Sequence, residues 1–309
     1  MRELPRSFLD SLKLHPPPVP IDLQKAYEQH AAYTKLIQQL VGAVVLVPAD
    51  ENCPDCVFIE DTLLSLGSHF IITRPGAPER SPEVQPVKLT VEHFFKDRPT
   101  LQASMHEIQA PATLDGGDVM FDGACLWVGL TDRTNEGGVQ QLKAILEPCG
   151  IPVVGIKVLD PDGLTLHLKS LVSAIGDRHV LVADNVAGHT LIEAATSKLK
   201  IKTGVSTDAD APEPEMSDLT PKARSQGGQT CSMTVESTLR ITLIPDQLCA
   251  NVLRIGNNVV MQAGFPASEV IIRGICHEQG LALHTLDMSE LAKADGALTC
   301  CSVLARILV

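Results

Sequence analysis

Hydrophobic and polar positions repeat in a fixed order along this chain of 309 residues. Each copy has two short apolar runs around a polar turn, followed by a segment of helical periodicity and a further apolar run. The turn glycines Gly67, Gly123, Gly176 and Gly256 mark four copies. Paired β-rich runs around such a turn are typical of a hairpin. The pattern therefore predicts four units, each a hairpin followed by a helix and a strand.

The helices of these units are expected at about 82–97, 135–147, 189–199 and 267–279, with further strands near 104–109, 151–158 and 281–286. The N-terminal part offers a helix over about 22–40 and then the apolar run 43–49, and the C-terminal run 298–308 is expected to be a buried strand. Residues 203–236 are polar and rich in Pro, Gly and Ser, so we expect most of them to form a flexible loop insertion.

We predict that the two ends of the chain pair into a fifth unit, which closes a ring without free sheet edges. The predicted fold is thus α/β, with five units around a pseudo-fivefold axis in one domain that spans residues 1–309. The alternative is an ordinary doubly wound sheet. The hairpins count against it, because that fold joins its parallel strands through helical crossovers. In a ring, each unit contributes one short stretch to a site near the axis.

Composition and charge exclude several classes of function. The net charge of −12 argues against non-specific binding to nucleic acid or to anionic membranes and mildly favours a cationic ligand. No apolar run approaches the ~20 residues of a membrane span, and the N-terminus lacks the apolar core of a secretory signal. Nine scattered cysteines indicate free thiols in a reducing, cytosolic compartment. The segment Cys53-Pro54-Asp55-Cys56 is a weak signal for zinc or redox chemistry, because no second pair follows at ligand spacing.

Acidic residues gather where the first two hairpins begin. Asp55, Glu60 and Asp61 lie within seven residues of one another, beside apolar positions. They form either a solvated strand end or a pocket for a planar cation, since a carboxylate accepts two parallel N–H bonds from a guanidinium. Asp115 and Asp118 flank two glycines ahead of the second hairpin, a sequence that needs no function if it is only a tight loop.

A histidine and a cysteine pair add candidate chemistry. His167 lies among leucines on a predicted strand, where a histidine is usually structural. Alternation along a strand would place Cys300 and Cys301 on opposite faces without saying which thiol faces a site, and a free cysteine is most often a small core residue. If they converge, a thiol, an imidazole and a carboxylate supply a nucleophile, a proton donor and a group that orients the donor. Extra carboxylates would then favour a guanidine or amidine substrate.

Six segments, PADENCPDCVFIED, ITRPGAP, ATLDGGDVMF, VGLTDRTN, LHLKS and MSELAKADGALTCCSVL, follow one another along most of the chain. In them the chain resembles the dimethylarginine dimethylaminohydrolase family of the pentein superfamily. The resemblance implies a five-bladed α/β propeller that hydrolyses Nω,Nω-dimethyl-L-arginine and Nω-methyl-L-arginine to L-citrulline and dimethylamine or methylamine. It also implies a covalent S-alkylthiouronium intermediate on a cysteine, with no metal and no cofactor.

The same motifs imply a role for particular residues. Cys300 would be the nucleophile, His167 the general acid and base, and Asp115 the carboxylate that orients His167. Asp61 would make the most direct contact with the guanidinium. The residues implied to bind the substrate are Asp55, Glu60 and Asp61 at the guanidinium, Arg80 and Arg133 at the carboxylate, and the backbone carbonyls of Ala294 and Lys13 at the α-amino group.

The chain also departs from the family pattern. The strand that precedes LPRSF in the family is missing here or reduced to MREL, so either the fifth blade lacks its first strand or the sequence is a truncated form. The segment 203–236 is longer than the corresponding segment in the family. Two other functions stay open: an arginine deiminase-type amidinohydrolase acting on unmethylated arginine, and a non-catalytic relative that binds arginine analogues. We expect a small cationic amino acid as partner, no nucleic acid, no membrane, and a cytoplasmic monomer or weak homodimer.

Overall fold

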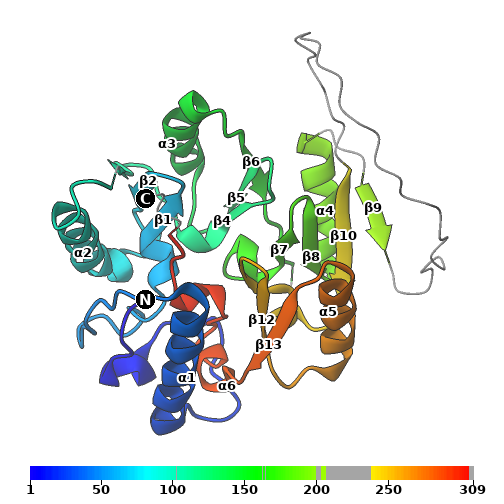
Figure 1. Ribbon diagram of the computed structural model, residues 1–309, viewed down its shortest axis with the longest axis horizontal. Helices are drawn as coiled ribbons and strands as arrows, with labels where there is room; N and C mark the ends of the chain where they lie inside the picture. The colour runs from blue at the N-terminus through cyan, green and yellow to red at the C-terminus, as the bar shows by residue number, and fades with distance from the viewer. Residues whose placement is uncertain (102, 162, 164, 200–202, 207–237, 306–309) are drawn as a thin grey trace.

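The structure is a computed structural model, which describes residues 1–309 except 102, 162, 164, 200–202, 207–237 and 306–309. The described residues form an α/β fold in which four small sheets are arranged side by side (Figure 1). The longer helices lie around the outside of these sheets (Figure 1). The predicted α/β class is therefore confirmed, whereas the described strands form no closed sheet.

Three of the sheets have the predicted order of elements. In each, an antiparallel hairpin is followed by a helix and then by a strand that pairs parallel to the second hairpin strand. The elements are β1 (Leu63–Leu66), β2 (His69–Ile72), α2 (Val84–Lys96) and β3 (Ser104–Glu107); β4 (Val119–Phe121), β5 (Leu126–Leu130), α3 (Glu136–Leu146) and β6 (Val153–Lys157); and β11 (Leu253–Ile255), β12 (Asn258–Gln262), α5 (Pro266–Glu278) and β13 (Ala282–Leu286).

The remaining sheet has a fourth strand. Its elements are β7 (Val172–Gly176), β8 (His179–Ala183), α4 (Val186–Leu199), β9 (Thr203–Ser206) and β10 (Leu239–Ile244), with the strand order β7-β8-β10-β9. Strand β10 pairs parallel to both β8 and β9. The predicted loop over 203–236 thus begins with a strand, and its residues 207–236 lie outside the described part. Local pattern did not reveal β10, because its partner β8 lies on the far side of the long insertion.

The two ends of the chain differ from the prediction. Helix α1 (Leu23–Val41) forms as expected, but the run 43–49 contributes only an isolated parallel bridge between Arg2 and Val47. The C-terminal run 298–308 was expected to be a strand, and this was wrong for residues near its start. Thr299–Cys301 is a 3₁₀ helix, η8, with i→i+3 hydrogen bonds such as Ser302 N to Thr299 O. The buried Tyr33 hydroxyl donates to the Leu298 carbonyl at 2.8 Å and fixes the entry into this turn.

Short 3₁₀ helices at the start of the units meet in the middle of the molecule. They are η2 (Ile59–Thr62), η4 (Gly116–Asp118), η6 (Leu168–Ser170) and η7 (Gln247–Ala250), together with η8. In space η8 contacts η2, η2 contacts η4, η4 contacts η6, and η6 contacts η7. Asn251, which follows η7, accepts a hydrogen bond from Thr299 N at 3.1 Å. This bond links η7 to η8, the two turns at the ends of this series of contacts. The central turns and the residues just before them therefore bring together five of the predicted site residues: Glu60, Asp61, Asp115, His167 and Cys300.

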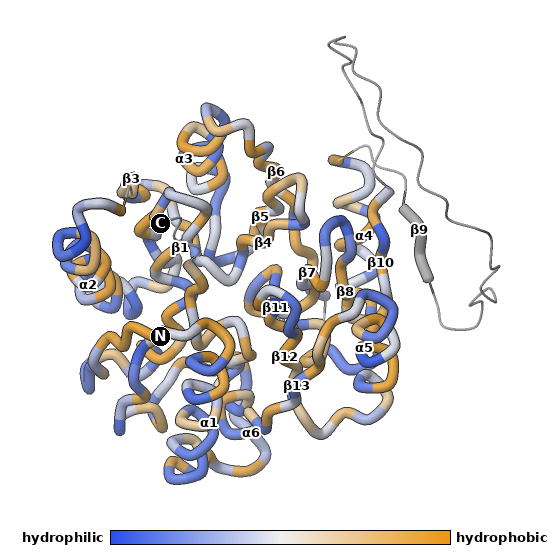
Figure 2. Tube along the Cα trace, viewed as in Figure 1, coloured by the Kyte–Doolittle hydropathy of each residue, from blue (hydrophilic) through white to orange (hydrophobic). Residues whose placement is uncertain are grey.

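Hydrophobic packing explains why the helices lie outside the sheets. The helices α1, α2 and α5 alternate polar and apolar residues, as Figure 2 shows. In α1 the apolar face buries Ala26, Tyr33 and Ile37, the spacing expected of an amphipathic helix that covers a core. Every residue of β8 is buried, as in a strand covered on both faces. Among the described residues, no helix combines the length and the apolar character needed to cross a membrane.

Candidate active site

The predicted site residues meet at one cavity of about 170 Å³ among the central turns. All of them except Asp115 line it. The predicted residues in its wall are Lys13, Asp55, Glu60, Asp61, Arg80, Arg133, His167, Ala294 and Cys300. Asp115 has no exposed surface and lies behind His167. Segments separated by most of the length of the chain thus converge on a single cavity.

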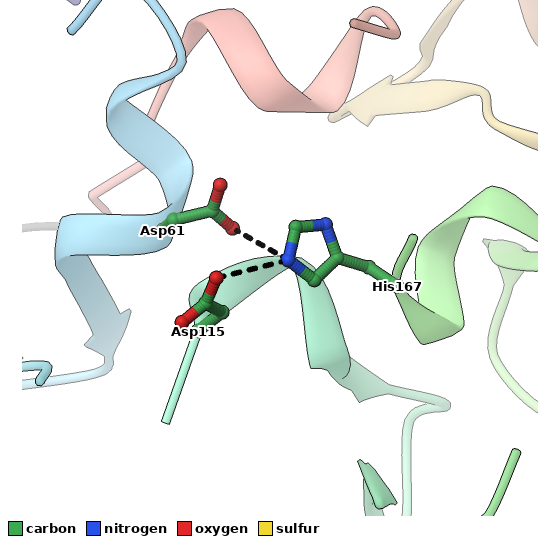
Figure 3. Close-up of side chains that lie close together, drawn as sticks. All are labelled: Asp61, Asp115 and His167. Atoms are coloured by element: carbon green, nitrogen blue, oxygen red, sulfur yellow. Dashed lines mark hydrogen bonds and ion pairs between the residues drawn. The ribbon is translucent and has the colours of Figure 1, made fainter. Parts of the chain in front are cut away.

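Two carboxylates point at the same nitrogen of the His167 ring (Figure 3). The Nε2 atom lies 3.0 Å from Asp115 Oδ2 and 3.8 Å from Asp61 Oδ1. Asp115 is itself held by the backbone N–H of Gly76, which donates to its other oxygen at 2.8 Å. His167 is the N-cap residue of η6 and not part of a strand as predicted. The predicted pairing of Asp115 with His167 is present in the structure.

The electrostatic surroundings of His167 favour its protonated form. Burial alone lowers the pKa of a histidine, but here the negative charges of Asp61, Asp115 and Asp118 outweigh burial and raise the pKa of His167 to about 9. Burial likewise acts to raise the pKa of Asp61, yet the His167 ring and the Arg80 guanidinium hold it at about 2. At neutral pH the pair is therefore an imidazolium against a carboxylate, and the ring can act as a proton donor.

The glycines of the Asp-Gly-Gly-Asp turn are needed for close packing, and its aspartates supply the carboxylates. A Cβ added to Gly117 would lie 2.8 Å from Asp61 Oδ1 and 2.8 Å from two atoms of the His167 ring. The Gly117 N–H donates to that same Asp61 oxygen at 2.8 Å. Asp118, at the end of the turn, accepts from Leu168 N at 2.8 Å and so fixes η6 relative to η4. The turn holds the acids and the histidine in register.

The ligand atoms of Asp61, Asp115 and His167 lie within 4.8 Å of one another, close enough in principle to hold a metal ion. The donor set does not fit that use well. An imidazolium has no free lone pair for a metal, and Asp61 already binds the Arg80 guanidinium. The arrangement suits proton transfer better than metal coordination.

Glu60 has partners that the sequence did not reveal. Its Oε1 atom forms an ion pair with Lys169 Nζ, and its Oε2 atom accepts from the Thr299 hydroxyl at 2.8 Å. Burial raises the pKa of Glu60, while the Lys169 charge acts in the opposite direction. Lys169 stands two residues after His167, and its place in the segment LHLKS was the only sequence signal for it. Asn251, which donates to the Lys169 carbonyl at 2.9 Å, offered no such signal.

The Arg80 guanidinium is bound by acids of the protein itself. Its guanidinium is buried and binds Asp61 and Glu83, with Nη2 2.7 Å from Glu83 Oε2. It also donates to the Phe58 carbonyl at 2.9 Å. Arg80 was expected to bind a substrate carboxylate; the hydrogen bonds of its guanidinium go to two acids and two backbone carbonyls of the protein itself. It holds Asp61 in place, and no sequence signal pointed to its partner Glu83.

Two carboxylates hold the N-terminal loop that forms part of the cavity wall. Both oxygens of Asp55 accept from Leu12 N, at 3.1 and 3.2 Å, and Asp295 Oδ2 accepts from Leu14 N at 2.6 Å. Asp55 was expected at the guanidinium end, but it lies beneath this loop. The Arg133 side chain is half-buried in the cavity wall and makes no hydrogen bond or ion pair with any residue that the structure describes. Arg133 is therefore a cation available to a ligand.

The two cysteines of the C-terminal turn have different surroundings. Cys300 lines the cavity and is partly exposed, whereas Cys301 is fully buried in a hydrophobic cluster with Tyr33 and Leu298. Burial, together with the negative charges of Glu60 and Asp61, raises the pKa of the Cys300 thiol to about 12. At neutral pH Cys300 is therefore a neutral thiol beside carboxylates, and a bound cation would shift it towards the thiolate.

Comparisons with known proteins agree with this geometry. The family model for N,N dimethylarginine dimethylhydrolase, eukaryotic, matches residues 18–200. The N(G),N(G)-dimethylarginine dimethylaminohydrolase of Streptomyces coelicolor is 30% identical to this chain, over 93% of this chain and 88% of that protein. The protein of the same name from Pseudomonas aeruginosa is 28% identical, over 91% of this chain and 89% of that protein.

Solved structures extend the similarity to the fold. A mutant of the Pseudomonas aeruginosa protein in complex with citrulline superimposes with a TM-score of 0.71 at 27% identity, and the match covers 98% of this chain and 96% of that one. The N-terminal domain of a cyanobacterial arginine dihydrolase shares the fold alone, with a TM-score of 0.65 at 17% identity over 97% and 95% of the two chains. Because the family model matches more than half of the sequence and the Streptomyces relative spans nearly all of it, the chain belongs to the dimethylarginine dimethylaminohydrolase family of the pentein superfamily.

Proposed function

We propose that this protein hydrolyses Nω,Nω-dimethyl-L-arginine and Nω-methyl-L-arginine to L-citrulline and the corresponding methylamine. The observation that carries the proposal is the composition of one cavity. A thiol, a histidine with its orienting carboxylate and a pair of acids line it together with Arg133, whose side chain binds no residue that the structure describes. A molecule that carries both a guanidinium and a carboxylate matches these two kinds of group.

The bound substrate would span the cavity from Glu60 to Arg133. Glu60 and Asp61 each keep lone pairs beyond those used by Lys169, Thr299 and Arg80, because a carboxylate offers about four acceptor positions. These can accept from the flat guanidinium and fix its plane. At the other end Arg133 would bind the substrate carboxylate, and the backbone carbonyls of Lys13 and Ala294 would accept from the α-ammonium.

The charge of the substrate supplies the activation of the nucleophile. Burial and the charges of Glu60 and Asp61 raise the pKa of Cys300 to about 12. A guanidinium between these acids and the sulfur offsets their charge, so the thiol loses its proton to solvent when the substrate binds. His167 need not accept that proton, because it is already an imidazolium at neutral pH. Cys300 is then a thiolate that can attack, and His167 is an imidazolium that can donate a proton.

The reaction would proceed in two stages. The Cys300 thiolate attacks the central guanidinium carbon, and the electron pair of one C=N bond moves to nitrogen. His167 gives its proton to the departing methylamine, the C–N bond breaks, and an S-alkylthiouronium stays on Cys300. His167, now neutral, removes a proton from water as the water attacks the same carbon. The new hydroxyl then loses its proton to solvent as the C–S bond breaks, which releases citrulline and regenerates the thiolate. General acid–base assistance of this kind contributes roughly 10²- to 10⁴-fold.

We further infer that the fold is a five-bladed propeller whose fifth blade is incomplete. The support is the series of contacts that joins the five central turns to one another. Four of these turns each precede one of the four sheets, and the fifth belongs to the C-terminal segment. The Arg2–Val47 bridge would be what remains of the sheet in the fifth blade.

Product analysis with three substrates tests the proposed function. Citrulline formation from dimethylarginine, monomethylarginine and arginine should be measured side by side. The proposal expects turnover of the methylated substrates with release of the methylamine and little ammonia from arginine. Preferential turnover of arginine would favour the deiminase-type alternative, and binding of all three without citrulline would favour a non-catalytic relative.

Replacing Arg133 by alanine is expected to raise KM by about 10- to 100-fold with little change in kcat. A hydrogen bond to a charged group contributes about 1.5–3 kcal/mol, which corresponds to that range, and the carboxylate lies far from the reacting carbon. Steady-state kinetics of Arg133→Ala measure both parameters. Arg98→Ala is the matched control, because Arg98 is exposed just after the end of α2, lies over the Phe94 ring and does not line the cavity. An unchanged KM would reject the role of Arg133.

Replacing Glu60 by glutamine is expected to lower the pKa of the Cys300 thiol. The Glu60 charge raises that pKa, so its removal stabilises the thiolate, and Lys169 keeps its positive charge nearby. The pH dependence of Cys300 alkylation, followed by peptide mass spectrometry without substrate, should move to lower pH. The exposed Glu79 on the adjacent turn provides the control Glu79→Gln, which should leave the profile in place. A shift to higher pH in Glu60→Gln would contradict this electrostatic account.

A further inference from the structure

Outside the active site, two histidines and a cysteine from three separate elements touch one another. His69 begins β2, His106 lies on β3, and Cys149 ends the 3₁₀ helix η5 (Glu147–Cys149). The Cys149 sulfur is 3.1 Å from Nε2 of His69, and Nδ1 of His69 is 3.1 Å from Nε2 of His106. The two imidazole rings are stacked, with centroids 5.3 Å apart. None of the three residues lines the proposed active-site cavity.

Cys149 differs from the other thiols that the structure describes. It is the exposed one, while the others are buried apart from Cys300 in its cavity. Burial raises the pKa of Cys125 to about 11 and that of Cys249 to about 12, so these thiols are poor ligands for solutes. Cys149 is open to solvent and has an imidazole at contact distance. Cys149 and His69 can therefore supply a thiolate and an imidazole ligand to the same ion from solution.

We propose that Cys149 and His69 bind a thiophilic divalent metal ion, for which Zn²⁺ is the best match, and that His106 orients His69. Thiolate and imidazole are the ligands that Zn²⁺ prefers, at about 2.3 Å and 2.0–2.1 Å. Tetrahedral geometry with these bond lengths places sulfur and nitrogen about 3.6 Å apart. The observed 3.1 Å requires the two ligands to separate by about 0.5 Å, which a residue at the exposed end of a short 3₁₀ helix can accommodate.

The proton balance at this site is simple. The thiol proton of Cys149 leaves to solvent, the metal takes its place between sulfur and Nε2, and water completes the coordination. His69 keeps its other proton on Nδ1 and donates it to His106 Nε2. Such a hydrogen bond fixes the tautomer and the ring orientation of a metal-binding histidine. The parallel pairing of β2 and β3 places His106 opposite Ile71, two residues from His69, so the backbone itself holds the two rings together.

Protection of Cys149 from alkylation tests the proposal at the site itself. Iodoacetamide labelling, read by peptide mass spectrometry with and without Zn²⁺, separates Cys149 from Cys300. Zn²⁺ should slow the labelling of Cys149 in the wild-type protein, and His69→Ala should abolish the protection. His106→Ala should weaken the apparent zinc affinity by about 10- to 100-fold, the usual effect of removing such an orienting partner. His277→Ala, at an exposed histidine on α5, is the matched control and should behave as wild type.

A spectroscopic measurement gives an independent answer. Co²⁺ in place of Zn²⁺ should produce a thiolate-to-metal charge-transfer band in the wild-type protein that Cys149→Ser lacks. These variants lie outside the proposed catalytic site and should keep wild-type turnover and melting temperature, which shows that they fold. Equal protection of Cys149 in wild type and His69→Ala, no protection at millimolar Zn²⁺, or a charge-transfer band that survives in Cys149→Ser would each overturn the proposal.

Discussion

Replacing Cys300 by serine is expected to reduce turnover by roughly 10⁴-fold or more, because the reaction loses its nucleophile. A serine hydroxyl has no comparable anion near neutral pH, and His167 cannot take its proton while it is an imidazolium. The effect should appear in kcat, since the acids and Arg133 that bind the substrate stay in place. Steady-state citrulline formation measures it, and substrate binding to the inactive variant should be retained in calorimetry.

The neighbouring cysteine supplies the matched control. Cys301 is fully buried, and its sulfur lies 3.8 Å from the Ala297 carbonyl, where a serine hydroxyl could also donate. Cys301→Ser should therefore keep most of its turnover per folded molecule, even if its melting temperature falls. Equal loss of activity in both variants, with both folded, would remove the assignment of Cys300 as the nucleophile.

Sequence patterns identified the hairpins because the signals for hairpins are local. Gly67 adopts φ +59° in the first turn, a conformation that glycine accepts without strain. The third hairpin shows the limit of this signal, since the residue with positive φ there is Arg178 and not the glycine that marked the copy. The helices followed from periodicity in the same way, within a few residues of their observed ends.

The C-terminal turn was mispredicted because its conformation depends on distant partners. Taken alone, the apolar run Leu298-Thr299-Cys300-Cys301 predicts a strand. In the structure, Tyr33 binds the Leu298 carbonyl and Asn251 binds Thr299, and both come from segments far away in the sequence. These contacts outweigh local preference and replace the strand with a 3₁₀ turn. The alternation argument for the two cysteines therefore did not apply.

The partners of the site's charges were missed for a related reason. A sequence shows which residues can carry charge but not which pairs form. Arg80 and Lys169 both stood in recognised motifs, yet their ion pairs with Asp61 and Glu60 arise only when η2, η3 (Pro78–Glu83) and η6 come together. The two acids proposed to bind the substrate thus already have cations of the protein as partners. The substrate guanidinium adds a charge to a network that is already partly neutralised.

Replacing His167 by asparagine is expected to lower turnover of dimethylarginine by about 10²- to 10⁴-fold, the usual contribution of a general acid and base. The first stage loses the proton for the departing amine, and the second loses the base that activates water. An isothiourea analogue, whose thiolate leaving group needs no proton, should bypass the first defect and accumulate an adduct on Cys300. Mass spectrometry of the quenched reaction detects that adduct, and its absence would argue against covalent catalysis.

The variant Asp115→Asn tests whether Asp115 acts through the protonation of His167 or has only a structural role. The Asp115 charge helps raise the pKa of His167 to about 9, so its removal lowers that pKa. The proton donor is present below the pKa of His167 and is lost as pH rises through it. The alkaline limit of kcat should therefore move to lower pH in Asp115→Asn, whereas Asp122→Asn, at a buried carboxylate that binds Arg178 and Trp127, should leave it unchanged. A purely structural role for Asp115 would reduce activity equally at every pH, so an unshifted profile would reject its action through His167.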